Sequence, residues 1–196
     1  MLSFTIAVLI LVITPGPAVL SIAGVGAAFG FRVGIGYVLG VVLGANLVAV
    51  FVISGLAAVL FSFPELRIIL MSVSLCYLIF LAARIAFAGS KLGFTKVVKP
   101  PGIWSGIIIQ TINPKAYVVM VALFSGFPFL PENVLAETTI KFTIANFFWI
   151  PAHLIWLYFG VAINQLNLSD NAAWSVNIAM ALAMLGVVAV TVLSAS

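Results

Sequence analysis

The sequence predicts an all-α polytopic membrane protein, and its composition and charge pattern carry that prediction. Hydrophobic residues make up 65% of the chain and charged residues only 6%, whereas a soluble domain has about 25% charged residues. Each of four charge-free runs exceeds the roughly 20 residues that a helix needs to cross a bilayer. Because these runs are continuously apolar and do not alternate, they exclude an outer-membrane barrel. The runs lie at residues 1–31, 33–64, 142–169 and 171–196.

Polar turns and turns marked by proline or glycine divide this apolar sequence into six predicted spans. We expect a single transmembrane domain of two repeats, at about residues 1–88 and 102–196, joined by a basic linker at about 89–101. Three spans on each side of the linker place the repeats in opposite orientations, which is the arrangement of an inverted repeat. The predicted spans lie near residues 3–28, 35–60, 66–88, 103–126, 139–164 and 173–194.

The segments between the spans follow in chain order. The first span lacks the basic start of a signal peptide, and its apolar run is longer than the apolar core of a signal peptide. We therefore expect this span to remain part of the mature protein. Arg32 lies in the loop before the second span, and Glu65 lies at the start of the third. The basic linker precedes the fourth span, while Glu132 and Asp170 precede the fifth and sixth.

Basic residues predict the orientation of the chain in the membrane. One side holds Arg32, Arg84, Lys91, Lys96 and Lys99, and the linker among them contains no acid. The opposite loops hold Arg67 and Lys141, accompanied by Glu65, Glu132 and Glu137. We therefore expect the linker to be cytoplasmic and both termini to face outward.

The first helix of each repeat is predicted to be broken. Lys115 is the only charge between Pro100 and Pro131, and a cation at the centre of a membrane helix costs roughly 2.5–3.5 kcal/mol. It belongs to the segment Asn113-Pro114-Lys115-Ala116, which aligns with Thr14-Pro15-Gly16-Pro17 when the two halves are superposed. Both segments fall at a similar depth in their span, so the two breaks are expected to meet.

Asparagines recur between the repeats in the same register. The pair Ala45-Asn46 in the second span returns as Ala145-Asn146 in the fifth. These amides, and Gln110 with Asn113 on one helix face, either line a pathway or form hydrogen bonds across helices. The sequence leaves both interpretations open.

Prolines inside a helix release backbone carbonyls four residues earlier. Pro15, Pro17 and Pro114 would release the carbonyls of Leu11, Ile13 and Gln110. The alternative is a kink that serves packing alone. Freed carbonyls suit an ammonium group, and the N-terminal ends of half-helices suit a carboxylate. Together they predict a site for a zwitterion such as an amino acid.

Two segments resemble the signatures of the LysE/RhtB family of amino-acid exporters. They are Ile13-Thr14-Pro15-Gly16-Pro17 and the stretch from Gly106 to Asn113-Pro114-Lys115-Ala116, and the resemblance covers essentially the whole chain. It implies a multi-pass protein of the bacterial inner membrane that exports amino acids or close derivatives, driven by the proton motive force. We expect alternating access around the broken helices, without a cofactor and without enzymatic activity.

We expect the residues that bind the substrate, or that gate its path, to lie at the two breaks and on the helices beside them. Lys115 either attracts the substrate carboxylate or only stabilises its own break. No carboxylate lies at mid-span, so Glu65, His153, Lys115 or the substrate itself must carry the coupled proton. The candidate substrate-binding or gating residues are Thr14, Pro15, Gly16, Pro17, Asn46, Gln110, Asn113, Pro114, Lys115, Asn146 and Pro151.

Other functions fit the sequence less well. An exporter of metal cations is disfavoured because this chain has no cluster of acids, cysteines or histidines to bind a metal. Lys115 would also repel a metal cation. An intramembrane enzyme is disfavoured because the single histidine and the few acids are scattered, and Cys76 alone cannot form a thiol pair. No basic patch suggests nucleic acid.

The expected partners are a small-molecule substrate and the lipid bilayer. We favour a neutral amino acid, because no acid within the spans would bind a basic side chain. The glycine stripe of Gly36, Gly40 and Gly44 allows close helix packing, either within one protomer or across a homodimer.

Overall fold

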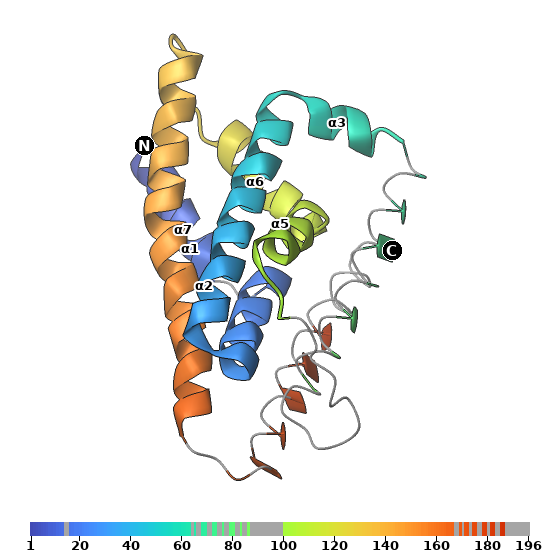
Figure 1. Cartoon of the computed structure of the whole chain (residues 1–196). Helices are drawn as coiled ribbons and strands as arrows, with labels where there is room; N and C mark the ends of the chain where they lie inside the picture. Colours follow the sequence, from blue (N-terminus) through green and yellow to red (C-terminus); the bar gives the residue numbers. More distant parts are fainter. Residues whose placement is uncertain are drawn as a thin grey trace.

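The computed structural model describes residues 1–13, 16–63 and 100–166, with separate positions between 65 and 86 and between 169 and 186 (Figure 1). All secondary-structure elements in these parts are helices, which confirms the predicted all-α class. Most of the predicted spans near 66–88 and 173–194, and of the linker, lies outside the described residues. The helices are α1 (Leu2–Ile13), α2 (Pro17–Ile53), α3 (Leu56–Phe61), α5 (Ile103–Thr111), α6 (Pro114–Gly126) and α7 (Val134–Gln165).

Among the described helices, α2 and α7 are long and apolar enough to cross a membrane. The pair α5 and α6 forms a third candidate span, bent by 70° at the break between its two helices. The described chain therefore has the two or three candidate spans of a membrane protein, and the fourth predicted span is broken at the expected place.

The first predicted span is also broken. α1 ends at Ile13, and α2 begins at Pro17, whose fixed φ suits the first position of a helix. α2 then turns at Gly30, where a φ of 76° is readily adopted only by glycine. The two segments of α2 lie side by side (Figure 1), and the hydroxyl of Tyr37 donates to Ser21 Oγ at 2.9 Å between them. Gly30 thus separates the first predicted span from the second.

Close approaches between backbones hold α5 and α7 against α2. A Cβ atom on Gly106 of α5 would lie 2.7 Å from the backbone nitrogen of Val41. A Cβ atom on Gly160 of α7 would likewise collide with the carbonyl group of Ala23. Glycine at both positions lets α5 and α7 pack directly on the two segments of α2. Within the protomer, Gly40 of the predicted stripe faces the backbone of Ile103.

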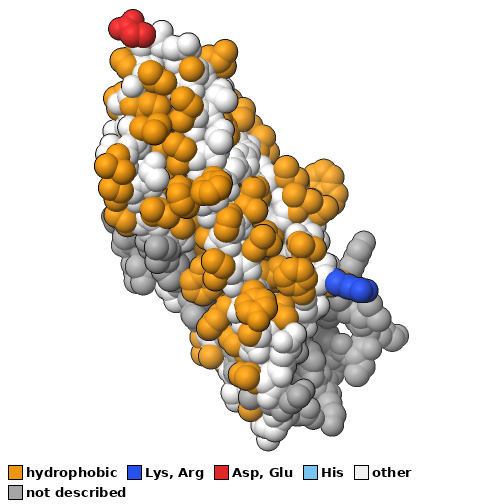
Figure 2. All heavy atoms as spheres, turned by 90° about the vertical axis from the view of Figure 1, so that its left-hand side faces the viewer, with side chains coloured by type: hydrophobic (Ala, Val, Ile, Leu, Met, Phe, Trp, Pro, Cys, Tyr) orange, Lys and Arg blue, Asp and Glu red, His pale blue; other side chains and the backbone are white. Residues whose placement is uncertain are grey.

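The outer face of α1 and α7 is strongly hydrophobic. Figure 2 shows apolar side chains over most of this face, with few charges. An apolar surface of this extent is stable against lipid acyl chains and unstable in water. The exposed large side chains on these two helices include Leu2, Ile6, Ile10, Phe147, Ile155 and Phe159.

A buried cation lies near the start of α7. Lys141 is 1% exposed; its Nζ donates to the carbonyl of Phe124 at 2.9 Å and pairs with Glu137 at 2.7 Å. The same Nζ lies 5.8 Å from the ring centroid of Phe4, a residue of α1. The expectation that Lys141 and Glu137 lie in a loop is wrong, because α7 begins at Val134. The pair instead joins α1, α6 and α7.

Candidate functional site: a cavity between two broken helices

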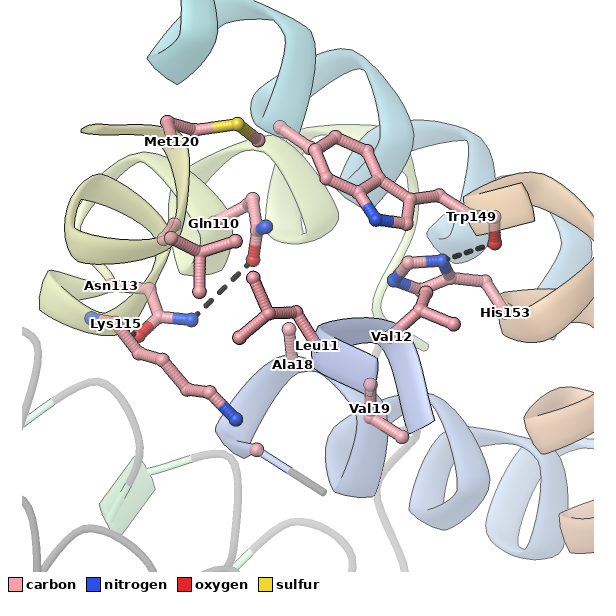
Figure 3. A pocket seen from close by; sticks show the side chains of 14 residues that line it. Leu11, Val12, Ala18, Val19, Gln110, Asn113, Lys115, Met120, Trp149 and His153 are labelled. Atoms are coloured by element: carbon pink, nitrogen blue, oxygen red, sulfur yellow. Dashed lines mark hydrogen bonds between the residues drawn. The ribbon is translucent and has the colours of Figure 1, made fainter. Parts of the chain in front are cut away.

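The two breaks border one cavity of about 80 Å³. Its walls come from α1, α2, the end of α5, α6 and α7 (Figure 3). One part of the lining is apolar and contains Leu11, Val12, Val19, Val119 and Met120. The other part is polar and contains Gln110, Asn113, Lys115, Trp149 and His153.

The second break is ordered by the side chain of Asn113. This residue precedes α6, and its Oδ1 accepts the backbone N–H of Lys115 at 3.1 Å. Its Nδ2 donates to Gln110 Oε1 at 3.5 Å, which connects the end of α5 to the start of α6 (Figure 3). Pro114 occupies the first position of α6. The sequence Asn-Pro is thus an N-cap followed by a helix-starting proline.

The carbonyls near the second break are not left free by Pro114. The carbonyl of Gln110 accepts the backbone N–H of Asn113 at 3.3 Å, and the carbonyl of Thr111 accepts the hydroxyl of Tyr117 at 2.9 Å. The prediction of a freed Gln110 carbonyl is therefore wrong. The reason is that Pro114 is the first residue of α6 and does not lie inside a helix. At this position proline lacks only an N–H that would have had no partner within the helix, so no carbonyl of α5 loses a donor to it.

The first break contacts the second through Lys115. Gly16 is buried and extended, with φ −151° and ψ 173°, and it precedes α2. A Cβ atom on Gly16 would lie 3.0 Å from Lys115 Nζ and 3.2 Å from its Cδ. The absence of a side chain at residue 16 therefore makes room for the lysine. The N-terminal ends of α2 and α6 consequently border the same cavity as this cation.

The α7 wall carries a histidine and a tryptophan. His153 is 7% exposed, and its Nδ1 lies 2.6 Å from the carbonyl oxygen of Trp149. Because a carbonyl oxygen only accepts, Nδ1 must carry a proton in this bond. Trp149 is equally buried and adds its indole ring to the cavity lining (Figure 3).

The two repeated asparagines pair with each other outside the cavity lining. Asn46 Nδ2 donates to Asn146 Oδ1 at 2.9 Å, and Asn146 Nδ2 donates back to Asn46 Oδ1 at 2.8 Å. Each Nδ2 also donates to the carbonyl four residues earlier in its own helix, at 2.8 Å to Val42 and 2.9 Å to Phe142. The sequence left open whether these asparagines line a pathway or bond across helices. In the structure, Asn46 and Asn146 form hydrogen bonds across helices.

The candidate residues are divided between the cavity and other parts of the structure. Gly16, Gln110, Asn113, Lys115 and His153 line the cavity. Pro17 and Pro114 begin the helices next to it, whereas Pro151 is exposed on α7 and Glu65 is exposed after α3. Thr14 and Pro15 lie outside the described residues.

The apolar lining was not identifiable from the sequence, because its residue types are common to every span. Trp149 had one signal, since it lies four residues before the only histidine.

A comparison with protein families identifies the family of the chain. The family model described as LysE type translocator matches residues 9–196. The chain belongs to the LysE-type translocator family. Members of this family are transporters and not enzymes, so this LysE-type translocator is a membrane transport protein with a small-molecule substrate. No curated protein and no solved structure matches the chain.

Proposed function

We propose that this LysE-type translocator exports neutral amino acids, or close derivatives, across the bacterial inner membrane. The observation that carries the proposal is the concentration of positive charge at the cavity. Lys115 is the second residue of α6, and the N-terminal end of α2 borders the same cavity. Helix N-termini carry partial positive charge, so a cation in the first turn is unfavourable there. An anionic ligand group relieves this repulsion, which supports a carboxylate as the natural occupant.

The remaining lining supports a zwitterion with a neutral side chain. Among the described lining residues there is no acid, so a second positive charge on the substrate would have no counter-charge. Side-chain acceptors do occur, because Gln110 Oε1 and one nitrogen of His153 belong to the polar part of the lining. The apolar residues Leu11, Val12 and Met120 provide a surface for an aliphatic side chain.

Transport is proposed to proceed by alternating access between two inverted repeats. Two observations support the repeats: the matched breaks that adjoin at Gly16 and Lys115, and the reciprocal bonds between Asn46 and Asn146. In transporters with inverted repeats, substrate binds at half-helix ends near the bilayer midplane. The proton motive force is the proposed energy source, with the linker cytoplasmic and both termini outside.

Efflux from cells loaded by dipeptide feeding tests this function. Cells that express the protein should release one or more neutral amino acids faster than cells without it. Lys115→Gln should reduce this efflux roughly 10- to 100-fold at equal membrane abundance, because a charged hydrogen bond contributes about 1.5–3 kcal/mol.

A matched control makes this test specific. Arg32→Gln removes the same charge from an exposed residue beside the turn of α2 and should leave efflux unchanged. Efflux of no amino acid from the wild-type cells would reject the proposed substrate class. Unchanged efflux from the Lys115→Gln variant would reject the proposed role of the cation.

A further inference from the structure

The ring of His153 has one nitrogen with a fixed role and one without a protein partner. Its Nδ1–H donates to the Trp149 carbonyl at 2.6 Å, so the neutral ring must present a lone pair at Nε2. Among the described residues, none donates a hydrogen bond to Nε2, although the side chain is only 7% exposed. Figure 3 shows Nε2 on the edge of the ring that faces the cavity. A buried acceptor without a protein donor is well placed to receive one from a ligand.

The surroundings of this ring contain few groups that could supply or remove charge. In the cavity that the ring borders, α1 contributes Leu11 and Val12 and α2 contributes Val19, all of them apolar. From α6 the charged group on the cavity is Lys115, and from its own helix the neighbour is the neutral Trp149. No described lining residue is an acid. Among the described lining residues, His153 is therefore the group that combines an acceptor atom with an ionisable ring.

We propose that His153 Nε2 accepts a hydrogen bond from the substrate ammonium group, and that a proton competes with the substrate for this same lone pair. The inference rests on the proposed export of amino acids and deepens it by naming the coupling residue. Lys115 and the helix N-termini bind the carboxylate on one side of the cavity. His153 binds the ammonium on the α7 side, which orients the zwitterion between two walls.

The exchange of proton and substrate balances without any covalent change in the substrate. On the acidic outer side, a proton binds the Nε2 lone pair, and the resulting Nε2–H can no longer accept from the ammonium. Two cationic groups, Lys115 and protonated His153, then border the cavity and repel the ammonium, so the intact zwitterion leaves. After the site turns inward, Nε2 releases its proton to the cytoplasm and the lone pair is available again. Each cycle moves one proton in for each zwitterion out.

Two substitutions separate the acceptor from the proton. Gln at residue 153 can place an amide oxygen near the position of Nε2, which preserves an acceptor that does not titrate. Asn at residue 153 can still donate to the Trp149 carbonyl but has no acceptor at the ε position. The purified variants are reconstituted into liposomes with radiolabelled L-alanine, L-valine and L-leucine as probes. One assay measures exchange at equal pH on both sides, and the other measures accumulation driven by a pH gradient.

His153→Gln should retain exchange and lose gradient-driven accumulation. His153→Asn should weaken exchange about 10- to 100-fold, the loss expected for one hydrogen bond to a charged group. The apparent affinity of the wild type should fall as the pH is lowered through the titration range of histidine, and that of His153→Gln should stay constant. Tyr158→Phe is the control, because Tyr158 lies on the same helix but is 66% exposed on the outer surface.

Three results would overturn the assignment. Gradient-driven accumulation by His153→Gln at the wild-type level would show that the proton binds elsewhere. Unchanged exchange by His153→Asn would show that Nε2 does not receive the ammonium. Equal loss of exchange in both variants would indicate a purely structural histidine. Failure of the underlying export function looks different, because wild-type liposomes would then exchange none of the probes.

Discussion

The reciprocal amide pair between α2 and α7 makes a quantitative prediction about stability. Replacing Asn146 by Ala removes both bonds to Asn46, of 2.9 and 2.8 Å. The remaining Asn46 keeps its Nδ2 bond to the Val42 carbonyl, but its Oδ1 loses its donor. Interhelical bonds of this kind average about 0.6 kcal/mol each in membranes and reach about 1.7. We therefore expect each single Ala variant to lose about 1–2 kcal/mol of unfolding free energy.

The double variant Asn46→Ala/Asn146→Ala carries the decisive information. Once one partner is absent, removing the other breaks no further interhelical bond, so the double variant should cost little more than either single variant. The coupling energy from this cycle should be about 1–2 kcal/mol. Unfolding in mixed micelles by titration with a denaturing detergent provides the four free energies.

A control and a refuting outcome follow from the same helices. Thr143→Val removes a hydroxyl that bonds only within α7, to the Thr139 carbonyl at 2.9 Å, and should change stability by less than about 0.5 kcal/mol. Additivity of the two Asn variants within about 0.3–0.5 kcal/mol would refute the reasoning. It would mean that the two amides do not support each other in the membrane.

Two glycine substitutions test the packing of the site. Gly16→Ala places a Cβ atom 3.0 Å from Lys115 Nζ, so the lysine should shift and amino-acid efflux should fall roughly 10- to 100-fold at equal abundance; wild-type efflux would show that the position of the amine is unimportant. Gly106→Ala places a Cβ atom against the backbone of α2, which cannot move aside as a side chain can, so thermal unfolding should report a loss of about 1–3 kcal/mol. Gly126→Ala is the control for both, since a Cβ atom there meets nothing within 4 Å, and equal stability of Gly106→Ala and Gly126→Ala would contradict the packing argument.

The breaks were predictable from the sequence because proline and glycine act locally. Pro17 and Pro114 each begin a helix, and the preceding half-helices end at Ile13 and Thr111. The fate of the carbonyls was not predictable in the same way. It depends on whether a proline lies inside a helix or at its first position. The start of α6 is set by the Asn113 cap, and the Thr111 carbonyl accepts the hydroxyl of Tyr117, six residues later in the chain.

The composition of the cavity was predictable only in part. Gly16, Asn113 and Lys115 could be identified as candidate site residues because a missing side chain, an amide and a charge are each unusual in an apolar span. The asparagines illustrate the limit. The repeat of Ala-Asn predicted a relation between α2 and α7, but only the direction of each side chain decides between a pathway and an interhelical bond. Similarly, a lone histidine gives no sign of which nitrogen faces a cavity, because this depends on the bond to Trp149.

The position of Lys115 contradicts the usual placement of charge on helices, and this contradiction gives the site its chemistry. A cation is unfavourable at the start of α6, and the adjacent start of α2 adds to the repulsion. The two half-helix ends and the amine thus bring positive charge to one small cavity. The proposed substrate carboxylate would be attracted to this charge, so its binding would stabilise the contact between the breaks. In the proposed cycle, release therefore starts at the other end of the zwitterion, which is the reason to assign the proposed coupling step to the wall that carries His153.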